Sequence, residues 1–378
     1  MKIGVPKETR EHETRVAATP GTVKKFADLG AEVVVETGAG AAGVFTDAAY
    51  EAAGASIAKD FAATVQGADV VLKVLRPTRA ELKSLAEGQV LVCMMAPHAD
   101  RDTVEACASA GVDAFAMELM PRISRAQSMD VLSSQANLAG YKAVIEAASA
   151  YGRAFPQMMT AAGTVAPARV FVMGVGVAGL QAIATARRLG AVVTATDVRP
   201  DTEEQVQSLG AKFVAVKNEE FEKAQTSGGY AKEMSDGYKR QQAELIAEHI
   251  AKQEVVVTTA QIPGRKAPVL VTADMVASMK TGAVIVDLAI EQGGNVEGAE
   301  LDKVVVSENG VKIIGYANMA GRLAADASSL YARNLLNFLT PFIEEGKLAF
   351  DEEDEVVKGI RLTREGQVVH PNFAGKEG

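Results

Sequence analysis

The sequence is poor in the residues that build disulfide frameworks and metal centres. It has two cysteines, four histidines and no tryptophan among 378 residues. Cys93 and Cys107 lie among apolar or small residues, which indicates reduced, packed thiols of a cytosolic protein. Because no Cys/His cluster has the spacing of metal ligands, the sequence predicts no metal site.

Signals for membrane insertion and for nucleic-acid binding are also missing. The opening, MKIGVPKETREHETR, is charged and lacks the apolar core of a signal peptide, and no later apolar run approaches the length of a membrane span. The net charge of −9 argues against a nucleic-acid partner. We therefore expect a soluble, cytoplasmic chain, which can still dock on a membrane partner.

The most informative feature that is present is a strand, VFVM, that runs into the turn GVGVAG. Gly174, Gly176 and Gly179 have the spacing G-x-G-x-x-G, and Asp197 closes the next strand about 20 residues on. The glycines are expected to allow a sharp turn, approach of a pyrophosphate, and close helix packing, in that order. The free N–H groups of a helix that starts near Val177 would face the phosphates.

Asp197 bears on the choice of nucleotide. Its carboxylate would accept hydrogen bonds from an adenosine ribose and would repel a 2′-phosphate, which favours NAD over NADP. Arg199 weakens that preference, because an arginine can accommodate a 2′-phosphate. The alternative is a glycine-rich turn with no ligand, which the coincidence of strand, helix and acid disfavours.

Alternating strand and helix patterns, on a chain too long for one core, predict an α/β protein of two domains. In the first third, strands are expected at 2–5, 32–36, 69–74, 90–95 and 113–117, with helices such as 19–29 and 100–110. Around the glycine turn, strands are expected at 170–173, 192–196, 213–216, 255–259, 284–288 and 312–315. These six strands suit a doubly wound sheet of order 3-2-1-4-5-6.

The expected architecture is two Rossmann-like domains with parallel sheets, joined by long helices at 134–151 and 326–339. Residues 1–133 and 325–378 form the first, discontinuous domain, and residues 134–324 form the nucleotide-binding domain. The charged end, 352–378, is predicted to be a hairpin and a loose tail.

One connection, residues 217–238, is long, polar and rich in glycine. Such loops are usually functional or disordered. It is either a mobile lid that carries Tyr230 onto a nucleotide or a solvated surface loop, and composition alone favours the surface loop.

Four segments are distinctive enough to carry a family resemblance. They are MELMPRISRAQSMDVLSSQANLAGYKAV (117–144), TAAGTVAPARV (160–170), GGYAKEM (228–234) and NMAGRLAADAS (318–328). With the rest of the chain they resemble the NAD(H)-binding subunit, or domain I, of proton-translocating transhydrogenases. The related alanine dehydrogenases share the two-domain plan, the opening pattern, GVGVAG and the stretch around Asp287. The first domain is thus similar to that of alanine dehydrogenase.

The resemblance implies an oxidoreductase subunit (proton-translocating, Re/Si-specific). Hydride would pass between NAD(H) on this chain and NADP(H) on a partner chain, the NADP-binding domain III or beta subunit, and would be coupled to proton translocation by membrane domain II. It also implies a homodimer, with no membrane span of its own, held at the cytoplasmic side of the inner membrane through its partners.

The resemblance also carries site residues. Arg122, Gln127 and Asp130, with Ser133, stand where the family contacts the nicotinamide, its ribose and the pyrophosphate, and the first three are the residues expected to act in hydride transfer. The expected nucleotide contacts of the second domain are Gly174, Gly176, Val177, Ala178, Gly179, Asp197, Val198, Arg199, Gly229, Tyr230 and Gln261. At Gln261 the family more often has an apolar residue.

Without the family, the loop around Arg122 has two interpretations. Arg122 offers a planar fork of donors for phosphate or carboxamide oxygens, and Gln127 can both donate and accept. Asp130 could accept from hydroxyls or hold Arg122 in place. The other interpretation is a polar connection with an Arg–Asp surface pair, which residue types alone favour.

A dehydrogenase of amino or hydroxy acids moves a proton as well as a hydride, and so needs a positioned acid/base. At the strand end where alanine dehydrogenases keep a histidine, this sequence has Met94. Arg15 and Lys73 match positions that bind the keto-acid in those relatives, as relics or as members of ion pairs. His98 is the one substitute base, and a loop histidine beside Pro97 is the favoured interpretation.

Three functions follow as hypotheses. The first is the transhydrogenase subunit, which needs no acid/base because hydride moves between two nicotinamide rings. The second is a free-standing oxidoreductase similar to alanine dehydrogenase, and the third is an NAD-binding module without catalysis.

Overall fold

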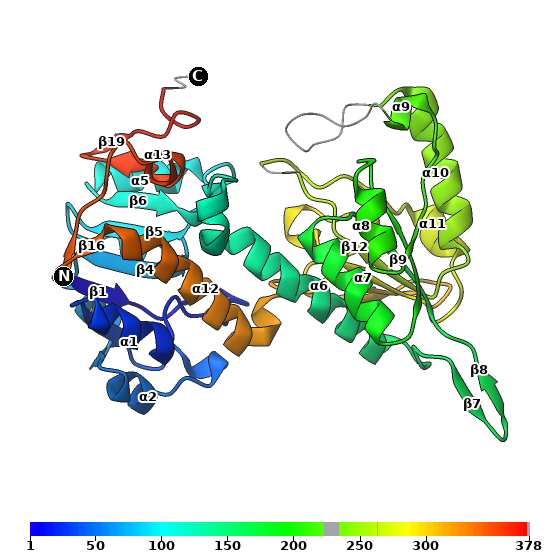
Figure 1. The fold of residues 1–378 in the computed structure, drawn as a ribbon, viewed down its shortest axis with the longest axis horizontal. Helices are drawn as coiled ribbons and strands as arrows, with labels where there is room; N and C mark the ends of the chain where they lie inside the picture. The colour runs from blue at the N-terminus through cyan, green and yellow to red at the C-terminus, as the bar shows by residue number, and fades with distance from the viewer. Residues whose placement is uncertain (223–233, 263, 376–378) are drawn as a thin grey trace. The chain divides into compact units, whose positions relative to one another are not determined.

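The computed structural model describes residues 1–222, 234–262 and 264–375. The chain divides into two compact units, Met1–Gln135 with Ala320–Gly378, and Ala136–Met319 (Figure 1). The sequence placed the junctions at 133/134 and 324/325.

The first unit is built on a six-stranded parallel sheet. Its strand order is β3-β2-β1-β4-β5-β6. The strands are β1 (Lys2–Val5), β2 (Glu32–Glu36), β3 (Ser56–Ala58), β4 (Val70–Leu75), β5 (Val90–Met94) and β6 (Asp113–Ala116). The apolar residues of β4 face two cores in alternation, Leu72 one and Val71 the other, as expected for a sheet covered on both faces.

Helices cover both faces of this sheet. They are α1 (Pro20–Asp28), α2 (Asp47–Ala52), α3 (Phe61–Val65), α4 (Arg79–Leu82), α5 (Arg101–Ser109), α12 (Ala324–Leu339) and α13 (Glu355–Ile360). Phe26 of α1 and Phe338 of α12 share one core, and Val104 of α5 lies in the other. Because α12 packs in this unit, the unit is discontinuous in sequence.

The second unit is built on a seven-stranded sheet of order β11-β10-β9-β12-β13-β15-β14. The strands are β9 (Arg169–Met173), β10 (Val192–Thr196), β11 (Lys212–Phe213), β12 (Val255–Thr258), β13 (Val284–Asp287), β14 (Val304–Val306) and β15 (Lys312–Ile314). The six expected strands pair in the predicted 3-2-1-4-5-6 order, all in parallel. The short edge strand β14 pairs antiparallel with β15 and was not predicted.

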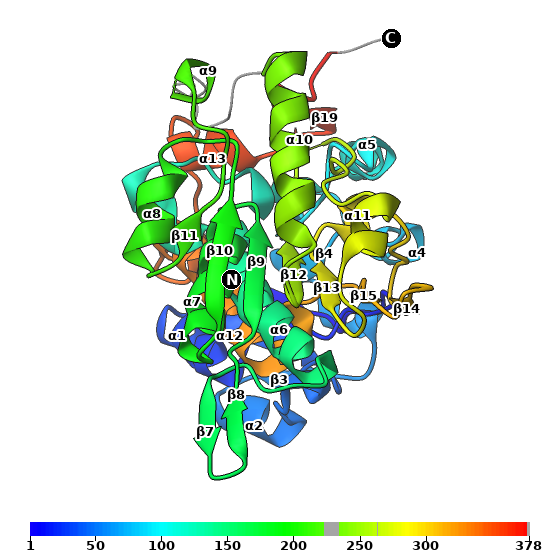
Figure 2. The same cartoon turned by 90° about the vertical axis from the view of Figure 1, so that its right-hand side faces the viewer.

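Two helical layers flank this sheet, and its strands lie side by side in Figure 2. The helices are α6 (Val131–Ala150), α7 (Val177–Arg188), α8 (Thr202–Ser208), α9 (Glu219–Glu222), α10 (Asp236–Ile250) and α11 (Ala273–Ser278). Ile183 of α7 packs on one face of the sheet and Ile250 of α10 on the other. Helix α6 crosses the junction between the units in sequence.

Short elements complete the fold. The 3-10 helices are η1 (Ala41–Gly43), η2 (Met117–Leu119), η3 (Ser124–Met129), η4 (Ile290–Gln292), η5 (Gly321–Leu323) and η6 (Thr340–Phe342). Three hairpins pair β7 (Met158–Thr160) with β8 (Gly163–Val165), β16 (Ile343–Glu344) with β17 (Lys347–Leu348), and β18 (Thr363–Arg364) with β19 (Gln367–Val368).

Several predicted bounds are corrected. The strand expected at 213–216 ends at Phe213, because β11 is an edge strand and the Val216 N–H bonds the Gln242 side chain instead, at 2.8 Å. The terminal hairpin expected within 352–378 is present as β18 and β19, but α13 precedes it. The hairpin β7–β8 and strand β3 were missed, because three-residue strands give too short an alternation to detect.

Candidate functional site

The glycine turn between β9 and α7 has the three properties that its spacing predicts. Gly174 has φ +102°, and a Cβ there would lie 2.5 Å from Thr259 Oγ1. A Cβ on Gly179 would lie 1.9 Å from the carbonyl oxygen of Gly174, so only glycine lets the helix pack this close to the turn. A Cβ on Gly176 would meet nothing within 4 Å. The first and third glycines are therefore required by packing, and the second opens onto free space.

Helix α7 presents its N-terminus at this turn. Gly176 is the N-cap residue, and no side chain caps the helix. Val177, the first helical residue, is 39% exposed. The following residue is fixed from behind by α6, because a Cβ on Gly140 would lie 2.1 Å from the Ala178 carbonyl oxygen. The helix thus offers a rigid, accessible N-terminus of the kind that binds phosphate groups.

The strand end after β10 carries the predicted acid. The Asp197 side chain is 7% exposed and accepts from the backbone N–H of Val175 at 2.7 Å. It also accepts from the Arg199 backbone N–H at 2.9 Å, and from Arg199 Nε and Nη2 at 2.8 and 2.9 Å. Val198 lies between them and is 53% exposed. The structure thus joins Asp197 to Arg199, a pairing that sequence reasoning did not foresee.

A second acid, Asp287, holds the loops at the ends of β12 and β13. It is fully buried and accepts from the backbone N–H groups of Ala289, Asn295 and Val296 and from Thr258 Oγ1. Burial raises the pKa of the Asp287 carboxyl, and the hydrogen bonds oppose that rise. Its position at a strand end before Gly293 and Gly294 was the sequence signal that could have identified this role.

Asn295 and Gln261 extend the same network. Asn295 Nδ2 donates to the carbonyls of Ala260 and Pro268 at 2.8 and 2.7 Å, and its Oδ1 accepts from the Ala260 N–H at 3.1 Å. The exposed Gln261 donates to the Leu288 carbonyl at 2.9 Å. The side chain of Gln261 therefore links the two loops at the carboxyl edge of the sheet.

In the first unit, the loop with Arg122 and Gln127 is anchored from below and exposed above. Ala126 and Met129 of η3 are buried in the core, whereas Arg122 and Gln127 are exposed. The Ser128 carbonyl accepts from two amides of α12, Asn334 and Asn337, at 2.9 and 3.0 Å. The loop is thus a fixed platform for polar side chains.

Asp130 acts as the cap of α6. Its carboxylate accepts from the Ser133 N–H at 2.9 Å and from the Ser133 hydroxyl at 2.5 Å. The surface Arg–Asp pair of this region joins Arg125 to Asp354 at 2.7 Å. Of the two sequence interpretations of Asp130, the hydroxyl acceptor is therefore the one that the structure shows, with Ser133 as the donor.

The end of β5 contains ion pairs. Arg15 is buried and bonds both oxygens of Glu13, from Nε at 2.8 Å and Nη2 at 2.7 Å, and also the Gln135 side chain at 3.0 Å. Lys73, also buried, lies 3.2 Å from Glu8 and 3.4 Å from Glu81. Burial works against the charge of Lys73, but the two carboxylates outweigh it and raise its pKa.

Met94 ends β5, and the loop after it is held by Glu118. Glu118 accepts from the backbone N–H groups of Met95, at 3.1 Å, and of Ala96. Ala96 has φ +49°, which is costly for a residue with a Cβ. His98 is exposed and packs edge-on against Phe373, with ring centroids 4.9 Å apart. It is therefore a surface loop histidine.

The structure leaves some of the predicted site untested. Gly229 and Tyr230, with the proposed lid, lie outside the described residues. The remaining positions form two groups, which we describe separately. Arg122, Gln127, Asp130 and Ser133 belong to the first unit, and Gly174 to Gly179, Asp197 to Arg199 and Gln261 belong to the second.

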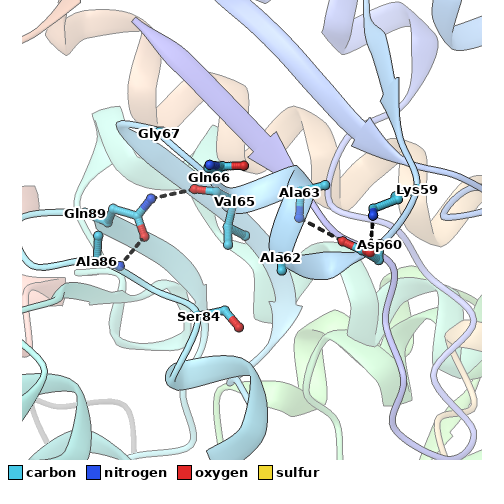
Figure 3. A pocket seen from close by; sticks show the side chains of 10 residues that line it. All are labelled: Lys59, Asp60, Ala62, Ala63, Val65, Gln66, Gly67, Ser84, Ala86 and Gln89. Atoms are coloured by element: carbon cyan, nitrogen blue, oxygen red, sulfur yellow. Dashed lines mark hydrogen bonds and ion pairs between the residues drawn. The ribbon is translucent and has the colours of Figure 1, made fainter.

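Other features of the described chain add no further site. The hollow beside α3 in Figure 3 has Gln89 at one end, whose amide donates to the Val65 carbonyl at 2.7 Å, and Lys59 and Asp60 at the other. Among the described residues, no three acids, histidines or cysteines gather as metal ligands would. Nor does any helix in these ranges combine the length and apolarity needed to cross a membrane.

Fold and turn together define a two-domain α/β protein with a dinucleotide-binding turn of the Rossmann type. The chain belongs to the alanine dehydrogenase/PNT family, whose N-terminal domain matches residues 4–139 and whose C-terminal domain matches residues 143–371.

Two kinds of relative share the whole fold. The chain is 55% identical to an NAD(P) transhydrogenase alpha subunit of Rhodospirillum rubrum, over 100% of both chains, and 30% identical to the alanine dehydrogenase of Halomonas elongata, over 96% and 93%. A solved transhydrogenase from Sinorhizobium meliloti matches with a TM-score of 0.89 at 55% identity, over 98% of this chain and 100% of that one. An L-alanine dehydrogenase matches with a TM-score of 0.81 at 26% identity, over 99% and 98%.

Proposed function

We propose that this chain is the NAD(H)-binding subunit of a proton-translocating, Re/Si-specific NAD(P) transhydrogenase. Hydride passes directly between NADH bound here and NADP⁺ held on a partner domain, and a membrane domain couples this transfer to proton translocation. The full-length identity to a transhydrogenase subunit supports this assignment over alanine dehydrogenase, to which the chain is less similar.

The second unit supplies a binding surface for the adenosine and pyrophosphate moieties of NADH. The N–H groups at the start of α7, with the open space over Gly176, suit the pyrophosphate. Asp197 lies where a ribose diol would be recognised, and the exposed Val198 offers an apolar contact for adenine. The loops that Asp287 and Asn295 fix, with Gln261, then border the nicotinamide half.

The first unit supplies polar groups for the nicotinamide end. Arg122 offers donors to phosphate or carboxamide oxygens, and Gln127 can donate to one group while it accepts from another. Because η3 is anchored to α12, these side chains stand on a rigid base, which suits a reaction that depends on orientation. Asp130 acts on the site through the helix cap that it forms with Ser133.

The observation that carries the proposal is the end of β5. NADH supplies the hydride when bound, so a partner nicotinamide ring needs no proton from the protein. A keto-acid substrate would need one, yet Met94 has no titratable group, and Arg15 already bonds Glu13 through two nitrogens. Transfer between two rings fits this strand end better than amination of a keto-acid.

The assembly that we propose is a homodimer, bound to the NADP-binding domain III or beta subunit and, through it, to membrane domain II at the cytoplasmic side of the inner membrane. The hairpin β7–β8 supports a contact between copies. Met158 and Met159 on it are 42% and 78% exposed, which is unusual for large apolar side chains outside an interface.

Reconstitution tests the proposal. The purified chain is mixed with a transhydrogenase NADP-binding domain, and hydride transfer from NADH to an NADP⁺ analogue is followed by absorbance. We expect transfer with the partner, and no oxidation of NADH by pyruvate and ammonia in its absence. Gln127→Asn should slow transfer by about tenfold or more, because it retracts the amide by one methylene. Ser124→Ala, on the same exposed helix, is the matched control.

Two results would contradict this assignment. Robust amination of pyruvate by the chain alone would identify an alanine dehydrogenase. NADH binding without transfer to any NADP-binding partner would identify a non-catalytic module.

A further inference from the structure

Asp197 has no acceptor site left for a ribose. A carboxylate offers about four lone-pair positions, two on each oxygen. Oδ1 accepts from the backbone N–H and Nε of Arg199, and Oδ2 accepts from the Val175 N–H and Arg199 Nη2. The acid that the nucleotide is expected to use is therefore already saturated by hydrogen bonds within the chain.

The four donors differ in how easily they can leave. The N–H groups of Val175 and Arg199 belong to the backbone turns that shape the site, and Val175 is buried. The Arg199 guanidinium is 32% exposed, and its Nη2 also bonds the Val175 carbonyl at 3.1 Å. Solvent can solvate the guanidinium when it moves, whereas the backbone donors cannot move without opening the turn.

We propose that the Arg199 side chain is a placeholder for the ribose diol. It keeps the nearly buried carboxylate of Asp197 hydrogen-bonded while no nucleotide is present, and it gives up its two positions to the ribose hydroxyls when NADH binds. This inference rests on the proposed NADH site, and it makes Arg199 a residue that lowers nucleotide affinity rather than one that supplies it.

The charge of the pair gives a second consequence. With Arg199 in place, the negative charge of Asp197 is compensated, so the site discriminates weakly by charge at the 2′-position. Once the ribose displaces the guanidinium, Asp197 faces the 2′-oxygen with its full charge. Removal of Arg199 should therefore strengthen both the recognition of the 2′-hydroxyl and the rejection of a 2′-phosphate.

The test is calorimetric titration of the full chain with NADH, 2′-deoxy-NADH and NADPH. Arg199→Ala should bind NADH about tenfold more tightly than the wild type, because no charged hydrogen bonds have to be broken first. The preference for NADH over 2′-deoxy-NADH and over NADPH should rise with it. Arg199→Lys, which keeps the charge without the fork, should fall between. Arg188→Ala, at the far end of α7, is the control for loss of one positive charge and should match the wild type.

A second measurement covers the folding of the variant. Without nucleotide, Arg199→Ala should unfold at a lower temperature than the wild type, and saturating NADH should narrow that difference. Equal or weaker NADH binding by Arg199→Ala, with normal binding by the wild type, overturns the placeholder alone. Failure of the wild type to bind NADH overturns the proposed function and the placeholder together.

Discussion

The carboxyl ends of two strands, β5 in the first unit and β9 in the second, show how one sheet plan can be closed or open. At β5, Arg15 and Lys73 are buried and are paired with carboxylates of their own chain. At β9, the chain continues into a turn whose middle glycine faces free space and into a helix without a side-chain cap. The comparison teaches that ion pairing satisfies one strand end internally, whereas the other leaves backbone donors for a ligand.

The largest expected effect comes from breaking the closed end. Arg15→Met leaves the Glu13 carboxylate, whose side chain is 1% exposed, without its cation. The free energy of unfolding in urea should fall by about 3–5 kcal/mol, as for other buried pairs that lose one partner. The double variant Arg15→Met with Glu13→Met removes both charges and should recover much of that loss. A double variant no more stable than the single one would show that the pairing is not what makes Arg15 necessary.

A smaller effect is expected at the open end, where two glycines can be compared directly. Gly179→Ala forces a Cβ against the Gly174 carbonyl and should cost about 1–3 kcal/mol of stability in urea unfolding. Gly176→Ala meets nothing in the chain, so its stability should stay within about 0.5 kcal/mol of the wild type while NADH affinity falls. Equal losses of stability in both would refute the division of roles within the turn.

The smallest effect concerns pH and the C-terminal segment beside the β5 loop. Burial lowers the pKa of His370, and the nearby His98 lowers it further, whereas the bond to the Gly359 carbonyl opposes this. A depressed folded-state pKa means that the folded chain binds fewer protons, so this stability is present above the ordinary histidine pKa and is lost on acidification. Thermal unfolding of His370→Gln should depend less on pH between about 7.5 and 5.5 than that of the wild type. The same slope in both would exclude His370 as a source, and His12→Gln serves as the control.

Much of the fold could be predicted because apolar runs and turn residues mark it locally. The bounds of β1, β2 and β10 are confirmed to the residue, and so is the strand order around the glycine turn. Strands of two or three residues escaped prediction, because their pairing depends on neighbours distant in the sequence. The same limit explains why β14 was missed.

For the site, the sequence predicted which residue types stand at each strand end, but not their partners. The requirement for glycine at positions 174 and 179 follows from local spacing and is confirmed by the geometry. The saturation of Asp197 by Arg199 depends on one side-chain rotamer, and the network of Asp287 depends on a loop that returns eight residues later. The roles of Arg122, Gln127, Tyr230 and Gln261 in nucleotide binding stay predictions.

The clamp formed by Glu118 also has a meaning for the evolution of this family. Because a carboxylate from the end of the neighbouring strand fixes the course of the backbone just beyond Met94, that course does not depend on which side chain occupies position 94. A thioether and an imidazole can replace one another there while the main chain stays in place. Descendants of one scaffold can thus gain or lose proton chemistry through single substitutions, without a new fold.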